Sequence, residues 1–261
     1  MDFFQAIILG IVEGATEYLP ISSTFHLIWT AKLLKITQTD FQKMFEVVIQ
    51  SGAILSILAL YLKTLTHDWQ LIKKIFVSFL PTAVVGLVLY KIIKNVFFES
   101  FSVQIGIFVL VGLLFVAIEK VWRQRQFTLK ASEITYSQAV IIGLAQAVAV
   151  FPGVSRAGAV ILAMMFFKVK RDEAAKYSFL LAVPTLLAAS ALDLFKSRSI
   201  IFAQADNLSL LLVGFGVSFL SALVVVRWFV GYLQSHQISL FGWYRLTLGL
   251  ALAGLVMAKI S

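Results

Sequence analysis

The chain has 261 residues, of which 60% are hydrophobic and only 13% are charged, and its mean hydropathy is +0.94. A typical soluble domain is about 45–50% apolar and about 25% charged, so this chain lacks the polar surface of a soluble globular protein. The absence of cysteine excludes disulfide scaffolds, thiolate metal sites and cysteine nucleophiles. We therefore expect a single helical membrane domain over residues 1–261.

The net charge of +9 would suggest a nucleic-acid partner in a soluble protein. Here the basic residues mostly lie between apolar segments, where they would meet anionic lipid headgroups. We therefore predict the bilayer as a partner and no binding of nucleic acid. Residues 1–4 do not form a basic leader and no small-residue cleavage site follows them, so we expect no cleaved signal peptide.

Six stretches have the length and apolar character of spanning helices, each of which needs about 20 apolar residues. Short polar turns separate them, as at Thr66-His67-Asp68. The six predicted spans are roughly 41–63, 72–95, 101–121, 173–195, 207–232 and 240–259.

Two further apolar stretches, 2–35 and 136–168, have polar residues and a proline at their middle. Each half is only about 12–16 residues long, which is too short to cross the hydrocarbon core. Broken backbone at membrane depth is tolerated where protein or a water-filled cavity surrounds it. We predict that each stretch is a re-entrant helix hairpin that enters and leaves on the same side.

The two stretches resemble each other, which predicts an internal repeat. Gly10-Ile11-Val12-Glu13 corresponds to Gly143-Leu144-Ala145-Gln146, and Pro20 and Pro152 hold similar places. Each hairpin precedes three spans, giving repeat one over about 1–125 and repeat two over about 132–261. Because each copy has an odd number of spans, the second copy would be inverted in the membrane. Paired interrupted helices of this kind point to a binding site near the midplane.

The positive-inside rule predicts the orientation. Twelve basic residues lie near one end of the predicted bundle and eight near the other, and the loop 119–135 carries the strongest excess. We therefore expect that loop in the cytoplasm and both termini outside.

Glu13 and Glu17 are the first candidate site residues. Their i,i+4 spacing places both carboxylates on one helix face, where they repel each other in an apolar segment. A shared proton, a cation or an arginine would offset this repulsion. The alternative is a helix end that reaches the interface, where glutamate costs little.

The run Pro20-Ile21-Ser22-Ser23-Thr24-Phe25-His26 follows directly. Proline and hydroxyl residues mark the start of a second half-helix, whose free N–H groups favour an anion such as phosphate. His26 lies one turn after Ser22 and Ser23, so it could contact either hydroxyl and act as base or acid. The alternative is ordinary N-capping with His26 at the interface.

The second hairpin carries the matching element Pro152-Gly153-Val154-Ser155-Arg156. Gly153 allows close backbone approach, Ser155 opens a half-helix, and Arg156 can bind phosphate bidentately. The alternative is an ion pair of Arg156 with Glu13 or Glu17. Glu46 and Gln50 could line the same cavity, and Arg245 could simply extend to the interface.

If the hairpin tips meet, two helix N-termini, several hydroxyls and one arginine converge on a site that suits more than one phosphate. The adjacent carboxylates suggest a divalent cation, Mg²⁺ or Ca²⁺, held by Glu13 and Glu17. Such a site inside the membrane suits a diphosphate headgroup on a lipid tail.

The residues Glu13-Gly14-Ala15-Thr16-Glu17-Tyr18-Leu19-Pro20-Ile21-Ser22-Ser23-Thr24-Phe25-His26-Leu27 closely resemble the first signature of the undecaprenyl-diphosphate phosphatase family, also called the bacitracin-resistance family. Pro152-Gly153-Val154-Ser155-Arg156 resembles its second signature. Weaker likenesses at 45–50, 178–184 and Tyr244-Arg245 extend the resemblance along the whole chain.

The resemblance implies a metal-dependent hydrolase in the cytoplasmic membrane of a bacterium, with its site toward the outer side. Its reaction converts undecaprenyl diphosphate to the monophosphate, which recycles the carrier for peptidoglycan synthesis and confers bacitracin resistance. Carried over by motif, Glu13, Glu17, Ser23, His26 and Arg156 are catalytic. The implied substrate-binding residues are Ser22, Thr24, Gly153 and Ser155. The attacking group is left open.

Three positions depart from the family pattern: Phe25 replaces a glycine, and Ala157 and Val160 replace hydroxyl residues. Lost phosphate donors could each cost about 1–3 kcal/mol, so we expect slower turnover or a different polyprenyl diphosphate. A transporter or flippase for the same lipid, or a binding protein without turnover, are the alternative functions. The sequence leaves the oligomeric state open, with a homodimer as one option.

Overall fold

The structure is a computed structural model that describes residues 1–37, 39–96, 101–201 and 205–258. The described residues are mainly helical, and their only β-pairing is an isolated bridge between Leu129 and Val169. Six helices are long and apolar enough to cross a membrane, which confirms a polytopic all-α membrane protein. They are α3 (Asp40–His67), α4 (Trp69–Val96), α5 (Phe101–Val121), α8 (Arg171–Ile201), α9 (Ala205–Ser235) and α10 (Ser239–Met257).

The six helices coincide with the six predicted spans, apart from residue 259, which lies outside the described residues. Prolines lie inside two of them, Pro81 in α4 and Pro184 in α8. Large apolar side chains such as Leu87 and Val224 are exposed on their outer faces. In a soluble protein such exposure would be costly, but here it suits contact with lipid tails.

The two interrupted stretches fold as two pairs of short helices. Helices α1 (Phe3–Thr16) and α2 (Ser23–Leu33) form the first pair, and α6 (Tyr136–Ala147) and α7 (Arg156–Phe166) form the second. A short 3₁₀ helix, η2 (Val148–Val150), follows α6, and another, η1 (Ala131–Glu133), lies in the loop before it. That these hairpins are re-entrant in a membrane stays a prediction.

The backbone repeats itself with a constant interval. The four non-glycine residues with positive φ are Ser22, Lys35, Ser155 and Lys168. Ser155 follows Ser22 by 133 residues, and Lys168 follows Lys35 by the same interval (155 minus 22; 168 minus 35). A left-handed backbone is uncommon for such residues, so two matching pairs are strong support for an internal repeat.

The repeat also governs packing. Helix α1 packs on α9 of the other half, and α6 packs on α4 in the same way. Glycines allow these approaches: a Cβ on Gly10 would lie 2.7 Å from the Gly214 carbonyl oxygen, and one on Gly143 would lie 2.1 Å from that of Ser78. Each hairpin therefore rests on the second span of the opposite half.

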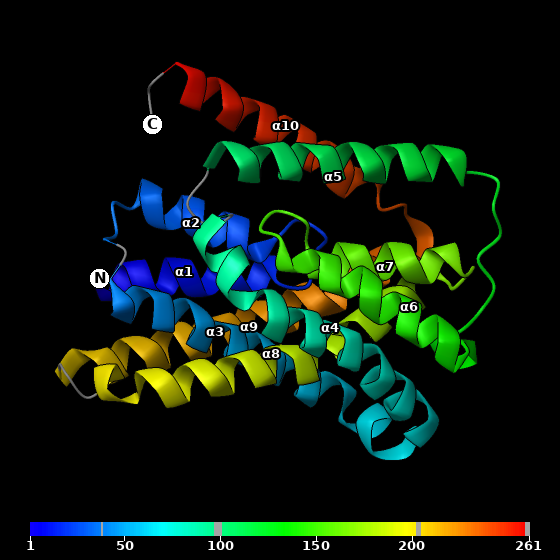
Figure 1. The fold of residues 1–261 in the computed structure, drawn as a ribbon, viewed down its shortest axis with the longest axis horizontal. Coiled ribbons are helices and arrows are strands. Elements are labelled where there is room, and N and C mark those ends of the chain that lie inside the picture. The colour runs from blue at the N-terminus through cyan, green and yellow to red at the C-terminus, as the bar shows by residue number, and fades with distance from the viewer. Residues whose placement is uncertain (38, 97–100, 202–204, 259–261) are drawn as a thin grey trace.

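Figure 1 shows the result. The hairpin α1–α2 extends from the left, where the N-terminus lies, and α6–α7 extends from the right, so that their tips meet in the middle. Helices α5 and α10 pack along each other as a separate outer layer at the top. The loop between α5 and α6 lies at the opposite end from the N-terminus, as the predicted topology requires.

Candidate active site

The two hairpin tips are held together by backbone and hydroxyl contacts. Ser22 and Ser155 are the N-cap residues of α2 and α7, and both have left-handed backbone, with φ of 67° and 75°. Ser155 Oγ accepts a hydrogen bond from Gly158 N–H at 3.2 Å and donates to the Leu19 carbonyl oxygen at 3.4 Å. Such strained positions are retained where the surrounding structure enforces them, and they cluster at functional sites.

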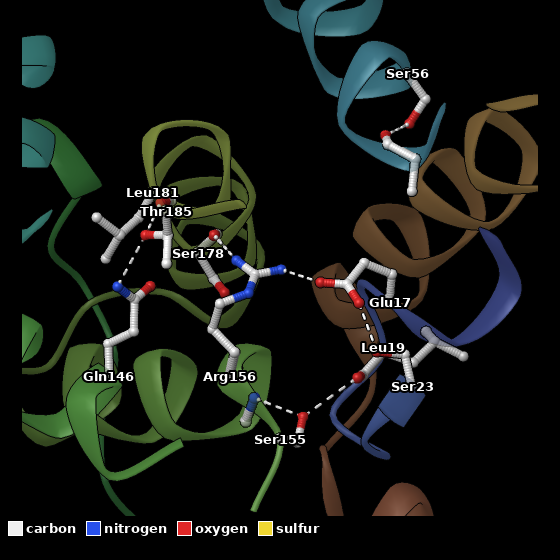
Figure 2. A network of polar contacts seen from close by, with 12 residues as sticks. Glu17, Leu19, Ser23, Ser56, Gln146, Ser155, Arg156, Ser178, Leu181 and Thr185 are labelled. Carbon is white, nitrogen blue, oxygen red and sulfur yellow. Dashed lines mark hydrogen bonds and ion pairs between the residues drawn. The ribbon is translucent and has the colours of Figure 1, made fainter. Parts of the chain in front are cut away.

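An ion pair joins the two repeats at these tips. Arg156 Nη2 lies 2.9 Å from Glu17 Oε1, and both side chains are nearly buried. Arg156 Nη1 donates to the Ser178 carbonyl oxygen at 3.1 Å, and Ser23 Oγ donates to the second oxygen of Glu17 at 2.5 Å. Figure 2 shows Arg156 reaching across to Glu17, with Ser23 on the far side of that carboxylate. The ion pair considered as an alternative for Arg156 is thus formed with Glu17.

A cavity of about 200 Å³ lies where the tips meet. Of the nine predicted site residues, seven line it, and they come from both hairpins. They are Glu17, Ser22, Ser23, Thr24, Gly153, Ser155 and Arg156. The two hairpins therefore bring hydroxyls, one carboxylate and one guanidinium into the same small space, as the sequence predicts. Their roles in catalysis or binding stay predictions.

Glu13 lies behind Glu17 and does not line the cavity. Its side chain is fully buried, no donor group bonds either carboxylate oxygen, and its hydrogen-bond contact is with the carboxyl of Glu17, which would need a shared proton. It is also repelled by the charges of Glu17 and Glu46. A buried carboxylate without a donor partner is costly, so this position suits a cation or a proton.

The oxygen atoms of Glu13 and Glu17 have the chemistry of ligands for a divalent cation. The unsatisfied oxygens of Glu13 and the carboxylate of Glu17 are the hard oxygen ligands that Mg²⁺ and Ca²⁺ prefer. Among the described residues, however, no group of three or more His, Cys, Asp or Glu side chains lies close enough together to hold a metal ion. A cation held by these two carboxylates would therefore take its remaining ligands from hydroxyls, water and the substrate's phosphate oxygens.

His26 lies differently from the sequence-based expectation. Its Nδ1 lies 2.8 Å from the Ser22 carbonyl oxygen, and its Nε2 lies 2.8 Å from the Tyr244 hydroxyl. The hydroxyls of Ser22 and Ser23 are therefore not its partners. The physical reason is helical geometry: the residue one turn before presents its backbone carbonyl, and α10 supplies a second partner that local spacing cannot reveal.

Uncharged polar residues that the sequence does not identify as site residues also line the cavity. Gln146 Nε2 donates to Thr82 Oγ1 at 2.8 Å and to Thr185 Oγ1 at 3.2 Å, and all three residues line the cavity. Gln146 stands 133 residues after Glu13, so the repeat alignment was the signal that could have found it. Gln50 also lines the cavity as expected, whereas Glu46 accepts a hydrogen bond from Gln42 instead.

Arg245 corrects another expectation. Instead of extending to the interface, it is fully buried. Its nitrogens donate to the carbonyl oxygens of Phe108 at 3.0 Å, Pro20 at 3.1 Å and Gly153. Its position near the start of a span suggested an interfacial residue, because sequence alone does not show that the hairpin tips reach this helix.

Comparisons with known proteins agree with this geometry. A sequence model of the family described as Bacitracin resistance protein BacA matches residues 6–251. The chain belongs to the BacA family. Its relatives include the undecaprenyl-diphosphatase of Aquifex aeolicus, 42% identical over 97% of this chain and 98% of the relative. The undecaprenyl-diphosphatase of Persephonella marina is 42% identical over 95% of this chain and 97% of the relative. That of Campylobacter hominis is 43% identical over 96% of this chain and 98% of the relative.

The structure locates this chain's departures from the BacA pattern. Ala157 and Val160 are fully buried, and neither lines the cavity. Phe25 is also buried and stacks on Phe108 with ring centroids 4.1 Å apart. The effect of these three positions on turnover therefore stays a prediction.

Proposed function

We propose that this chain hydrolyses undecaprenyl diphosphate to undecaprenyl phosphate and inorganic phosphate. The observation that supports this most is the cavity between the hairpin tips, where Arg156, Glu17 and several hydroxyls meet. The relatives named undecaprenyl-diphosphatase, similar along almost the full chain, support the same reaction. Water is consumed, the P–O–P bond breaks, and the lipid monophosphate leaves.

Arg156 and the hydroxyls would bind the diphosphate. Guanidinium binds phosphate bidentately, so an incoming phosphate can replace Glu17 as the partner of Arg156. The residues that begin α2 and α7 line the same cavity, and the N-terminus of a helix favours negative charge. These contacts would stabilise the charge that develops on the phosphoryl oxygens as the bond breaks.

Glu17 would act as the base. The Ser23 hydroxyl donates to it at 2.5 Å, so the proton acceptor already lies next to a candidate nucleophile. Of the hydroxyls in the cavity, this contact favours Ser23 as the attacking group. Its attack would form a phosphoserine as undecaprenyl phosphate leaves, and water would then hydrolyse the phosphoserine to release inorganic phosphate. His26, bound to Tyr244 and the Ser22 carbonyl, would support the tip and would not attack.

We propose that Glu13 and Glu17 hold a divalent cation, Mg²⁺ or Ca²⁺. When bound, the cation would neutralise phosphate charge in the cavity. The supporting observation is Glu13, whose two buried oxygens are not bonded by any donor group. Glu13 would act through this charge balance, and Glu17 would remain the residue that faces the substrate.

Phosphate release from undecaprenyl diphosphate by the purified protein in detergent tests the reaction. It should be measured with Mg²⁺, with Ca²⁺ and with chelator, for the wild type, Glu17→Ala and Arg156→Ala. Arg227→Ala, at an exposed position of α9, is the control. We expect metal-dependent turnover in the wild type and the control and its loss in both site variants. No turnover by the wild type with any cation would reject the hydrolase.

A transporter of the same lipid is the second candidate, because the repeated halves and broken helices are typical of transporters. Liposomes with labelled undecaprenyl phosphate separate the two functions. Movement of lipid between leaflets without hydrolysis would favour transport. A protein that binds the lipid but neither moves nor hydrolyses it would be the binding protein considered above.

The finer location is also a proposal: the bacterial inner membrane, with the site open to the outer side and a homodimer as the assembly. Because the chain has no cysteine, single cysteines report topology directly. An impermeant maleimide should label Thr37→Cys in intact cells and label Gln124→Cys only after permeabilisation. The reverse pattern would invert the protein. Overproduction should raise bacitracin resistance, and mass photometry in detergent would give the oligomeric state.

A further inference from the structure

Arg245 binds three backbone carbonyls from three separate segments. Its Nε donates to Phe108 of α5, its Nη1 to Pro20 of the first hairpin tip, and its Nη2 to Gly153 of the second. Each nitrogen of the guanidinium thus has a different partner. Because the guanidinium is planar and rigid, these three carbonyls must keep a fixed spacing around it.

The burial of Arg245 is unusual in having no acidic partner. Within the described part of the chain, no Asp or Glu forms an ion pair with it, and its nearest aromatic rings are Phe108 and Phe115, with the guanidinium carbon 4.4 and 5.6 Å from their centroids. A buried charge held only by dipoles and ring faces costs free energy. Arg156, in contrast, is neutralised by Glu17. Among the described residues Arg245 is therefore a buried positive charge without an ion-pair partner, and it binds Gly153, which lines the cavity.

The two tip carbonyls that Arg245 binds are equivalent in the repeat. Gly153 follows Pro20 by the same 133 residues that separate Ser22 from Ser155. Gly153 lines the cavity, and Pro20 lies two residues before Ser22, which also lines it. The Arg245 side chain thus joins equivalent backbone carbonyls of the two hairpins, at or within two residues of the cavity lining.

The residue before Arg245 makes a second, independent contact with the first tip. The Tyr244 hydroxyl lies 2.8 Å from His26 Nε2, and His26 Nδ1 lies 2.8 Å from the Ser22 carbonyl oxygen. The Tyr244 and His26 rings also stack, with an angle of 14° between them. Among the hydrogen bonds of the described residues, helix α10 therefore contacts the first tip at Pro20 and through His26, and the second tip through Arg245.

We propose that Arg245 is a positioning residue for the hydrolysis: it holds the two hairpin tips at the spacing that places Ser22 and Ser23 against Ser155 and Arg156. The expected effect on turnover rests on the proposed function. The hydrogen bonds of Arg245 to the two tips are observed independently of that function. A misplacement of about 1 Å at reacting groups can cost roughly 100-fold in rate, so loosening the tips should reduce kcat more than it raises KM.

The test compares Arg245→Lys, Arg245→Gln and Tyr244→Phe with the wild type and Arg227→Lys, which makes the same change at an exposed position of α9. Lysine keeps the charge but cannot bind three carbonyls in one plane. Two readouts are needed: kcat and KM for undecaprenyl diphosphate with Mg²⁺, and amide hydrogen exchange of residues 17–24 and 149–157 by mass spectrometry.

Arg245→Lys should lower kcat roughly 10- to 100-fold with a small change in KM, and it should increase exchange in both tips. Arg245→Gln should do the same and also raise KM, because it removes a positive charge beside the cavity. Tyr244→Phe should increase exchange in the first tip alone. Arg227→Lys should match the wild type in both readouts.

A kcat of Arg245→Lys within twofold of the wild type would overturn the proposal, as would unchanged exchange in both tips. Failure of both Arg245 variants to give a monodisperse protein, while Arg227→Lys folds, would assign Arg245 to stability alone and would also overturn it. If the wild type itself shows no turnover, the proposed function fails, and the exchange readout still decides whether Arg245 orders the tips.

Discussion

Glu17 and Arg156 belong to different hairpins, yet their side chains form an ion pair at 2.9 Å in the lining of the cavity. Both side chains are nearly buried, with 5% and 11% of their surface exposed. The two opposite charges offset each other, and each residue is the other's ion-pair partner. The pair therefore links folding of the two halves to the chemistry proposed for the site.

Breaking this pair from either side should destabilise the protein. Glu17→Gln and Arg156→Gln each leave one buried charge without a partner, so each should lower the free energy of unfolding by about 3 kcal/mol or more. The double variant should lose less than the sum of the two, with a coupling energy of about 1–3 kcal/mol. Thermal unfolding in detergent, read by tryptophan fluorescence, measures all three.

The exposed pair of Lys43 with Asp40, 4.0 Å apart, is the matched control. Surface pairs contribute little, so Lys43→Gln should change the unfolding temperature by no more than the experimental error. Additive effects of the Glu17 and Arg156 substitutions would show that the contact does not couple the repeats.

Glu13→Gln should separate stability from activity. Its carboxylate is buried and lacks a donor partner, so in chelator the neutral amide should raise the unfolding temperature. If Glu13 holds the cation, the same change should raise the Mg²⁺ concentration for half-maximal turnover by about tenfold or more. Titration of turnover with Mg²⁺, together with unfolding in chelator, measures both effects. A variant that is less stable in chelator and unchanged in its Mg²⁺ requirement would contradict the assignment.

Restoring the family's hydroxyl residues should not increase turnover. Ala157 and Val160 are fully buried and do not line the cavity, so we expect the hydroxyls of Ala157→Ser and Val160→Thr not to reach the substrate. We expect kcat/KM within about threefold of the wild type, because no phosphate donor is gained. Val160→Thr should also lower stability by about 1 kcal/mol, since a hydroxyl replaces a methyl group in the core. A tenfold rise in kcat/KM in either variant would show that these positions do reach the phosphate.

Much of the fold follows from the sequence because membrane helices are specified locally. Spans such as 101–121 need only length and apolar composition, and the structure places α5 over the same residues. The polar, proline-containing interruptions at Pro20 and Pro152 predicted the two tips. Seven of the nine predicted site residues line the cavity, because the motif residues at each tip lie within a few positions of the break.

The remaining features depend on contacts between distant segments. The partner of His26 is Tyr244, 218 residues away, and the carbonyls bound by Arg245 belong to both tips and to α5. Local spacing cannot reveal such contacts, so the sequence predicts neighbouring hydroxyls as partners of His26 and a place at the interface for Arg245. Gln146 was recognised as polar, but its contacts with Thr82 and Thr185 need the packing of α6 on two spans.

The close approach of α6 to α4 gives a final, purely structural prediction. A Cβ at Gly143 would lie 2.1 Å from the Ser78 carbonyl oxygen, and backbone cannot move aside as a flexible side chain could. Gly143→Ala should therefore push α6 away from α4 and lower the free energy of unfolding by about 1–3 kcal/mol. It should also reduce turnover, because α6 carries Gln146 and leads into the second tip.

Gly86→Ala is the control: it lies in α4 with open space around a Cβ, and alanine is the better helix former, so stability should stay level or rise. Equal unfolding temperatures for Gly143→Ala and Gly86→Ala would mean that α6 does not pack closely on α4. The packing of each hairpin on the second span of the opposite half would then be contradicted.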